Sequence, residues 1–158
     1  DGVWQSFGHD GLRPVNDHMP VTHISLYEAD AFASWAGARL PTEAELESAA
    51  ASGQSNGGQF LDRAGPVAPN YGLVGPNGFH DLFGSVWEWT GSAYRPYPGF
   101  RTAEGAIGEY NGKFMSGQFV LRGGSAATPR GHVRATYRNF FYPHQRWQFT
   151  GLRLAKDD

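Results

Sequence analysis

The chain has 158 residues, of which 40% are hydrophobic and 18% are charged, and its formal net charge is −2. This length suits one domain with a packed core, and the composition excludes an intrinsically disordered chain. The slight acidity argues against a nucleic-acid-binding surface, no apolar run approaches the roughly 20 residues of a membrane span, and the absence of cysteine excludes disulfides, thiolate metal sites and cysteine nucleophiles.

The first 24 residues predict an opening β segment followed by a turn-rich loop. Trp4 and Phe7 are large apolar residues in an otherwise polar stretch, and we expect them to anchor this segment. Glycine and proline are frequent between residues 8 and 20, which favours turns over a continued strand.

Two consecutive helices are predicted next, each from a local start signal. Ser25 is a good N-cap, and Glu28 stands three residues later, which is the spacing of a capping box. Thr42 and Glu45 repeat the same pattern directly behind a proline. Apolar residues recur at helical spacing after the first signal. The predicted helices cover residues 25–36 and 42–51.

Helical periodicity disappears after the second helix. Glycine, proline and asparagine dominate residues 52–80 and 91–118, which we expect to be extended ordered loops. Early helices, short strands expected to be antiparallel, and much loop make the fold class α+β. The strands are expected within residues 79–90, 119–122, 133–140 and 149–154.

Four motifs then occur in a fixed order along nearly the whole chain. They combine helix caps, an aromatic core strand and a glycine turn before a core arginine. Together they resemble the signature of the formylglycine-generating-enzyme-like, or sulfatase-modifying, domain, which has a C-type-lectin-like fold. Such a fold hosts many activities, so this resemblance implies architecture rather than function. The motifs are GARLPTEAE (37–45), GSVWEWT (84–90), LRGGS (121–125) and GLR (151–153).

A second set of segments carries a narrower resemblance, and much of it lies in predicted loops, where functional sites usually occur. The segments are YRPYPGF (94–100), GEYNGKF (108–114), TYRNFFYP (136–143) and RWQFTGLRL (146–154). They resemble the C-terminal half of the hercynine sulfoxide synthases of ergothioneine biosynthesis.

This resemblance implies an enzyme that uses a non-haem Fe(II) ion and O₂. In that family, a helical N-terminal half supplies three histidines to the iron, and the C-terminal half carries much of the pocket for N-α-trimethylhistidine (hercynine). A thiol donor, either cysteine or γ-glutamylcysteine, is joined to the imidazole with formation of a sulfoxide. Residues 1–158 would then be one substrate-binding domain, with the helical iron-binding domain as its partner in cis or in trans.

The same resemblance implies a role for Tyr110, which matches a tyrosine that stands near the iron–oxygen centre of the family and hands over a proton. A phenol suits this role because it is a weak acid on a ring that can be held rigidly. The alternative is an ordinary loop tyrosine that packs on its ring face.

Most of the substrate-binding residues implied by the resemblance lie at the end of the strand predicted at residues 133–140 or directly after it. Asn139 offers a donor and an acceptor to an imidazole or carboxylate. Phe140 and Phe141 could face a trimethylammonium group by cation–π attraction, or they could fill the core, and strand alternation would send one of them inward. Arg138 and Arg146 complete the expected set.

One departure from the family concerns the thiol donor. Members that use γ-glutamylcysteine have an acidic residue where Phe141 stands and an arginine where Gln145 stands. Because both charges are missing here, we expect free cysteine as the donor, although Arg146 is displaced by only one residue and could compensate.

The chain itself is expected to bind no iron, and it has no basic n-region with an apolar stretch, so a cytoplasmic protein without nucleic-acid or membrane partners is expected. No two histidines have the helical i, i+3 or i, i+4 spacing of a common metal-ligand pair. Generation of formylglycine, which in this family uses two cysteines, is excluded by their absence. A non-catalytic, lectin-like binding module on the same fold remains the alternative. The histidines are His9, His18, His23, His80, His132 and His144.

Overall fold

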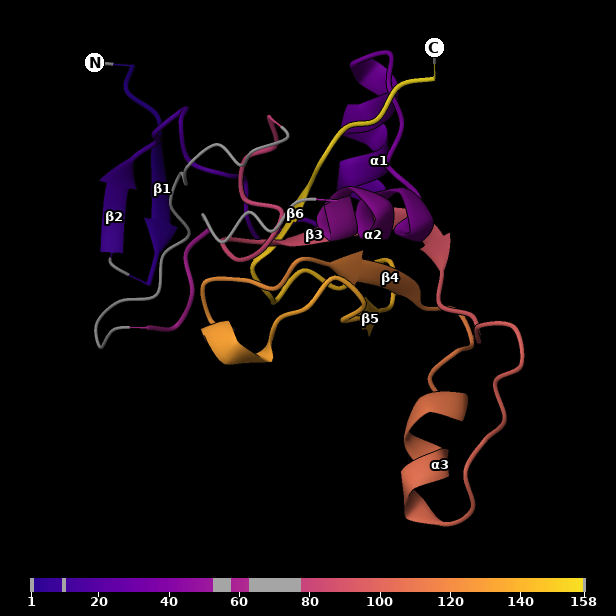
Figure 1. Ribbon diagram of the computed structural model, residues 1–158. Coiled ribbons are helices and arrows are strands. Elements are labelled where there is room, and N and C mark those ends of the chain that lie inside the picture. Colours follow the sequence, from indigo (N-terminus) through magenta and orange to yellow (C-terminus); the bar gives the residue numbers. More distant parts are fainter. Residues whose placement is uncertain (1, 10, 53–57, 63–77, 158) are drawn as a thin grey trace.

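Figure 1 shows the computed structural model, which describes residues 2–9, 11–52, 58–62 and 78–157. Most of the extended loop expected at 52–80 therefore lies outside the described residues. The fold is α+β, as the sequence predicts. Its described elements are β1 (Gln5–Gly8), β2 (Gly11–Pro14), α1 (Leu26–Trp35), α2 (Glu43–Ser52), β3 (Trp87–Ala93), α3 (Ala106–Gly112), β4 (Phe119–Arg122), the 3-10 helix η1 (Arg130–His132), β5 (Asn139–Phe141) and β6 (Thr150–Leu152).

The helices α1 and α2 begin where the capping boxes predict. The backbone N–H of Glu28 donates to Ser25 Oγ at 3.2 Å, and the N–H of Ser25 donates to Glu28 Oε2 at 2.7 Å. The pair Thr42 and Glu45 makes the same reciprocal contacts at the start of α2, at 2.7 and 3.2 Å. Each box satisfies two backbone donors that a helix start otherwise leaves open, so both predictions are confirmed.

A four-stranded sheet with the order β5-β4-β3-β6 forms the centre of the molecule. The β3–β4 and β4–β5 pairs are antiparallel, whereas β3 and β6 run parallel, with Trp87 opposite Thr150. The expectation of antiparallel strands throughout was wrong for this last pair. Since β5 and β6 lie on opposite edges of the sheet, the segment 142–149 crosses from one edge to the other, and β6 enters in the direction of β3.

The core lies between α1 and the sheet. Trp89 is fully buried, and its Nε1 donates to the carbonyl oxygen of Ile24 at 2.9 Å, so the indole is satisfied as well as packed. Leu121 is also fully buried and packs in the same cluster. Burial of each large apolar side chain contributes about 1.5–3 kcal/mol, which makes β3 and β4 the rigid base of the fold. The helical members of this cluster are Leu26, Ala29 and Ala33.

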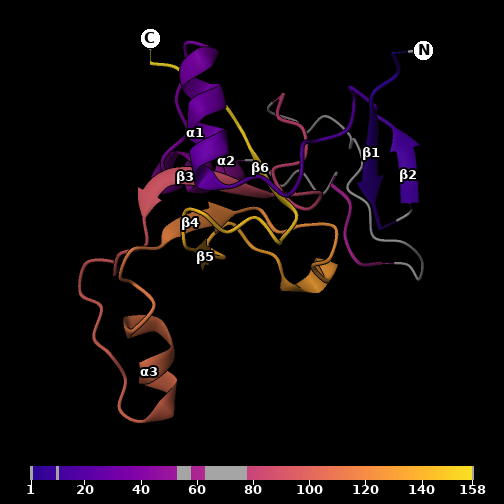
Figure 2. The same ribbon diagram turned by 180° about the vertical axis from the view of Figure 1, so that it is seen from behind.

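The opening β segment is a separate two-stranded hairpin, in which Ser6 of β1 pairs with Arg13 of β2. Figures 1 and 2 show it standing beside the sheet rather than on it. Trp4 and Phe7 are 84% and 82% exposed, so the expectation that they anchor the segment was wrong. An isolated hairpin has no second layer to cover its apolar side chains.

The expected loop at 91–118 contains a further helix, α3, which the sequence did not reveal. Its N-cap is Gly105, with φ at 77° and no capping side chain, so the usual start signal is missing. Two views show α3 extending away from the sheet (Figures 1 and 2). Ile107 on this helix is 83% exposed. The sequence therefore lacks the helical pattern of buried apolar residues from which α3 could have been predicted.

The strand predicted at 133–140 is much shorter than expected. Only residues from Asn139 onward pair with β4, because residues 133–138 form a loop in which the N–H of Tyr137 donates to the carbonyl oxygen of Arg134. None of the helices formed by the described residues has the length and apolarity required to cross a lipid bilayer.

Candidate functional site

Four aromatic rings gather where β3, β5 and α3 meet; we call Tyr94, Tyr110, Phe114 and Phe140 the aromatic cluster. Phe140 is its central member. Its ring stacks on Tyr94 with centroids 4.1 Å apart, and it lies 6.2 Å from Tyr110 and 5.9 Å from Phe114. Tyr110 and Phe114 meet edge to face at 5.3 Å. Stacked and tilted arrangements of this kind are favourable for aromatic quadrupoles.

The cluster runs from the protein interior to the solvent. Tyr94 follows the end of β3 and is 4% exposed, whereas Tyr110 is 60% exposed. The phenol of Tyr94 donates to Oδ1 of Asn111 on α3 at 3.3 Å. Burial raises the pKa of the Tyr94 phenol, so this group remains a protonated donor. Tyr94 thus links the buried sheet to the exposed helix that carries Tyr110.

Gly108 allows α3 to close against the preceding loop. A Cβ at this position would lie 1.7 Å from the carbonyl oxygen of Ala103, which no side chain permits. Gly108 is also the buried residue of α3. Gly108 therefore lets the backbone of α3 approach the preceding loop closely.

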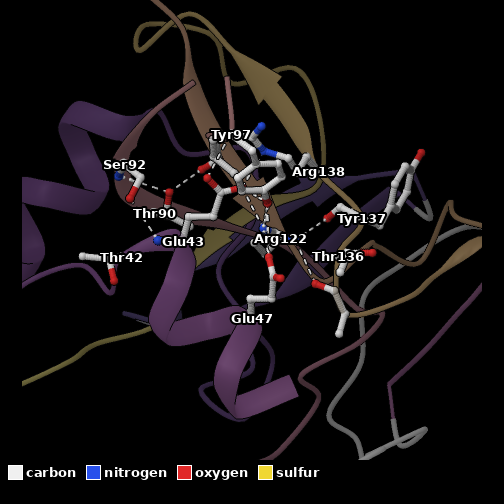
Figure 3. Close-up of polar contacts among 12 residues, drawn as sticks. Thr42, Glu43, Glu47, Thr90, Ser92, Tyr97, Arg122, Thr136, Tyr137 and Arg138 are labelled. Atoms are coloured by element: carbon white, nitrogen blue, oxygen red, sulfur yellow. Dashed lines mark hydrogen bonds and ion pairs between the residues drawn. The ribbon is translucent and has the colours of Figure 1, made fainter. Parts of the chain in front are cut away.

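Arg138 contacts both the aromatic cluster and α2. Its guanidinium lies near the rings of Tyr94 and Tyr97, and Figure 3 shows it beside Tyr97 and Glu43. Its guanidinium is 4.6 Å from the centroid of Tyr94 and 4.4 Å from that of Tyr97. Nη2 donates to Oε2 of Glu43 at 2.9 Å and to the carbonyl oxygen of Arg95 at 3.0 Å. Arg138 is therefore held from both faces and neutralised by a carboxylate.

Glu43 is shared with a second arginine, and we call Glu43, Glu47, Tyr97, Arg122 and Arg138 the Glu43 network. The side chain of Arg122 is 4% exposed, and its Nη2 donates to Glu43 Oε1 at 2.7 Å and also contacts Glu47. The same nitrogen donates to the phenol of Tyr97 at 2.9 Å. Burial raises the pKa of Tyr97, so its hydroxyl stays protonated between the carboxylates. The two positive charges of the arginines equal the two negative charges of the glutamates, as a nearly buried charge cluster requires.

The structure places Phe141 away from the aromatic cluster, whereas Asn139 contacts the backbone of Phe140. Phe141 follows Phe140 on β5 and therefore points to the opposite face, where it meets Trp147 edge to face at 5.0 Å and packs against the core. Oδ1 of Asn139 accepts from the backbone N–H of Phe140 at 2.9 Å. The expected alternation of the two phenylalanines is thus seen in the structure.

The side chain of Arg146 lies beside the first turn of α1, where its Nη1 pairs with Oε1 of Glu28 at 2.9 Å. The hydrogen bonds from Ser25, helped by this arginine, hold the pKa of Glu28 below its ordinary value. The structure thus brings Tyr110, Phe140 and, through Tyr94, Arg138 into one site, and leaves Arg146 outside it.

Sequence reasoning missed Tyr94 and the carboxylates of the Glu43 network as parts of this site. Tyr94 and Tyr97 both stand in the segment 94–100 that carries the family resemblance, so that segment held the available signal. Glu43 gave no local hint, because its partner Arg138 lies 95 residues further along the chain.

The described residues contain no group of three or more histidine, cysteine, aspartate or glutamate side chains that could hold a metal ion. His9 and His23 come near each other, with ring centroids 6.4 Å apart, but the ring of Phe149 packs against both of them. This set of side chains does not fit a non-haem iron, which needs several nitrogen or oxygen ligands at one point.

Comparisons with known proteins identify a family and several relatives. The family of sulfatase-modifying factor enzyme 1-like domains matches residues 1–71 and 65–158. Hercynine oxygenase from Mycobacterium tuberculosis is 38% identical over 172 residues, which cover 96% of this chain and 39% of that protein. Hercynine oxygenase from Mycolicibacterium smegmatis is 36% identical over 181 residues, which cover 99% of this chain and 41% of that protein.

Two further relatives are more distant. Ergothioneine biosynthesis protein 1 from Schizosaccharomyces pombe is 29% identical over 163 residues, covering 93% of this chain and 20% of that protein. The solved structure of PvdO from Pseudomonas aeruginosa has a TM-score of 0.63 at 20% identity, and it covers 90% of this chain and 64% of that one. This structural likeness shows the shared fold. The chain spans about two fifths of the length of the hercynine oxygenases.

Proposed function

This chain belongs to the family of sulfatase-modifying factor enzyme 1-like domains, and from its similarity to hercynine oxygenases we propose that it is the substrate-binding part of such an enzyme. The proposed reaction joins a thiol donor to hercynine, with O₂ as oxidant and a sulfoxide as product, in ergothioneine biosynthesis. One observation carries the proposal. Tyr110 and Phe140 come from separate segments that resemble the hercynine sulfoxide synthases, and they lie together in the aromatic cluster.

The aromatic cluster suits the trimethylammonium group of hercynine. Such a cation is attracted to aromatic ring faces by about 0.5–2 kcal/mol, depending on how far it is desolvated. Tyr110 presents an exposed ring at the edge of the cluster, and Phe140 is half-buried beside it. Because Glu43 neutralises Arg138, the arginine behind Tyr94 does not repel a bound cation.

Asn139 and Tyr110 supply the polar contacts in this proposal. Since Oδ1 of Asn139 accepts from the backbone, its Nδ2 is the group left to donate to the carboxylate or imidazole of hercynine. The exposed phenol of Tyr110 is the acid that this chain offers to the oxidation step.

Iron would supply oxygen activation in the complete enzyme. The described residues do not fit it, so we place its ligands in the part of the hercynine oxygenases that this chain does not span, whether that part is joined in cis or acts in trans. The activity of the whole enzyme then needs both parts.

Free cysteine is the thiol donor that this chain favours. A γ-glutamyl group would need charged partners near Phe141 and Gln145. Phe141 instead packs against the core, and Oε1 of Gln145 accepts from the N–H of Tyr142 at 3.0 Å. Arg146 could have replaced the missing arginine at position 145, but it forms an ion pair with Glu28 instead.

Calorimetric titration of the chain with hercynine and with histidine tests the binding part of this proposal. The two ligands differ in the trimethylammonium group, so hercynine should bind more tightly. Phe140→Leu should weaken hercynine binding by about 2- to 30-fold, the range that cation–π energies imply. Tyr142→Leu, an exposed aromatic outside the cluster, is the matched control and should bind like the unaltered chain.

Equal affinity for both ligands together with an unaffected Phe140→Leu variant would remove the aromatic cluster from substrate binding. Tight hercynine binding without any turnover in the longer protein would favour the lectin-like binding module instead.

A further inference from the structure

A cavity lies apart from the aromatic cluster, against a second and smaller group of buried apolar residues that includes Phe60 and Phe83. It has a volume of about 320 Å³, which is at the lower end of the range for small-molecule sites. Its floor is apolar, since Phe60 and Phe83 are 6% and 7% exposed and pack together in one core cluster. No residue of the aromatic cluster or the Glu43 network is among those that line it. The lining residues are Ala50, Ala51, Phe60, Phe83, Arg130, Val133, Arg134 and Ala135.

The two arginines at this cavity differ in their partners. Arg130 lies over the ring of Phe60, 4.4 Å from its centroid, and forms an ion pair with Asp62, so its charge is neutralised. Nε of Arg134 donates to Thr136 Oγ1 at 3.0 Å. Within the described part of the chain, no carboxylate forms an ion pair with Arg134. The guanidinium of Arg134 also lies 5.7 Å from the ring centroid of Tyr137. As far as the structure describes the chain, the cavity therefore combines an apolar floor with one arginine that no carboxylate neutralises.

We propose that this cavity is a binding site for a small monocarboxylate with an aromatic or branched aliphatic body. The carboxylate would pair with the Nη groups of Arg134, whose planar fork matches it, and the body would lie against Phe60, Phe83 and Val133. A single free cation on an apolar floor selects a monoanion, because a phosphate would bring a second charge without a partner. Ala50 and Ala51 lie in the last turn of α2, and the negative end of the helix dipole there disfavours the ligand's carboxylate on that side.

Titrations of the isotope-labelled chain, followed by NMR, test this site with three probes. Benzoate carries both the charge and the apolar body, benzyl alcohol carries the body alone, and acetate carries the charge alone. Benzoate should shift the amide signals of Ala50, Val133 and Ala135 saturably, and the other two probes should bind at least about tenfold more weakly.

Substitutions separate the two parts of the site. Arg134→Gln should weaken benzoate binding by about tenfold or more and leave benzyl alcohol unchanged, since a charged hydrogen bond is lost. Ala51→Phe, at an exposed lining residue, should fill the cavity and abolish binding of both without unfolding the chain. Arg101→Gln removes an exposed arginine on the loop before α3 and serves as the matched control.

Three results would overturn the proposal. They are the absence of saturable shifts at the lining residues, benzoate affinity that survives Arg134→Gln, and an equal loss of benzoate binding in Arg101→Gln. The last would mean that overall charge, and not this cavity, holds the probe.

Discussion

The rings of Tyr94 and Phe140 stack with their centroids 4.1 Å apart and their planes 8° from parallel. This contact joins the end of β3 to β5, and the phenol of Tyr94 reaches α3 through Asn111. Tyr94 also covers one face of Arg138, which Glu43 holds from α2. A path of direct contacts thus leads from α2 through the sheet to the helix that carries Tyr110.

Glu43→Gln should destabilise the fold strongly. The substitution removes the carboxylate that Arg122 and Arg138 share and leaves nearly buried positive charge only partly compensated by Glu47. Loss of one partner of a buried ion pair costs about 3–5 kcal/mol, and the remaining glutamate places the expected loss near the lower value. Urea denaturation measures it.

Glu45→Gln is the matched control for this experiment, because Glu45 is an exposed glutamate of the same helix that pairs with Arg39. Its urea midpoint at neutral pH should fall by much less than that of Glu43→Gln, because an exposed ion pair contributes less than a buried one. Similar midpoints for both variants would show that the Glu43 network contributes nothing beyond a surface pair.

Acid should unfold the chain partly through Glu45. Hydrogen bonds from Arg39 and Thr42 hold the pKa of Glu45 at about 2 in the folded chain, below its ordinary value of 4.5. A carboxyl whose folded pKa is depressed stabilises the fold fully above its unfolded pKa and loses that contribution as the pH falls from about 4.5 to about 2.

The melting temperature measured between pH 6 and pH 2.5 checks this prediction. Glu45→Gln has no carboxyl to protonate, so its melting temperature should fall less over this interval than that of the unaltered chain. Parallel curves would show that other carboxylates, such as Glu28, account for the acid lability.

Gly108→Ala should displace α3. The new Cβ would meet the carbonyl oxygen of Ala103 at 1.7 Å, so the turn before the helix must open. Amide hydrogen exchange over residues 106–112 should accelerate, and the contact between Tyr110 and Phe140 should be lost.

Gly112→Ala offers a control on the same helix, since a Cβ there meets only Thr102 Oγ1, at an ordinary 3.8 Å. Alanine also has a helix propensity about 1 kcal/mol better than glycine, so exchange should stay the same or slow down. Equal acceleration in both variants would contradict the role given to Gly108.

Local signals predicted the parts of the fold that local contacts determine. The boxes at Ser25 and Thr42 placed α1 and α2 because each box is made by residues three apart. Two features depend on contacts between distant residues and were not predicted from the sequence. They are the parallel pairing of β6 with β3 and the helix α3, which has glycine at its N-cap and leaves Ile107 exposed.

The same distinction applies to the candidate site. The family resemblance pointed to Tyr110 and Phe140, and the structure places them in contact range of each other. It also pointed to Arg146, which pairs with Glu28 instead. The Glu43 network could not be predicted, because arginine and glutamate occur throughout the chain and only the fold decides which of them meet.

Tyr110→Phe should separate substrate binding from sulfoxide formation in the complete enzyme. The ring and its contacts with Phe114 and Phe140 would remain, and only the hydroxyl proton would be lost. General acid contributions are typically worth about 10²–10⁴-fold in rate, so most sulfoxide formation should disappear while the thiol donor is oxidised to its sulfinate.

Asn139→Ala is the comparison for that variant. In the proposed function Asn139 makes a binding contact that the ground and transition states share, so its loss should chiefly raise the apparent KM for hercynine. Mass spectrometry of the products beside oxygen-consumption rates distinguishes the two effects, and an unchanged product ratio in Tyr110→Phe would reduce Tyr110 to a packing residue.

The proposed function is tested most directly by the products that the longer protein carrying this chain forms from hercynine, cysteine and O₂ in the presence of Fe(II). Mass spectrometry should detect the sulfoxide that joins cysteine to the imidazole of hercynine, formed only with O₂ and faster from cysteine than from γ-glutamylcysteine. Recovery of unaltered hercynine from an iron-loaded, folded protein under these conditions would contradict the proposed function.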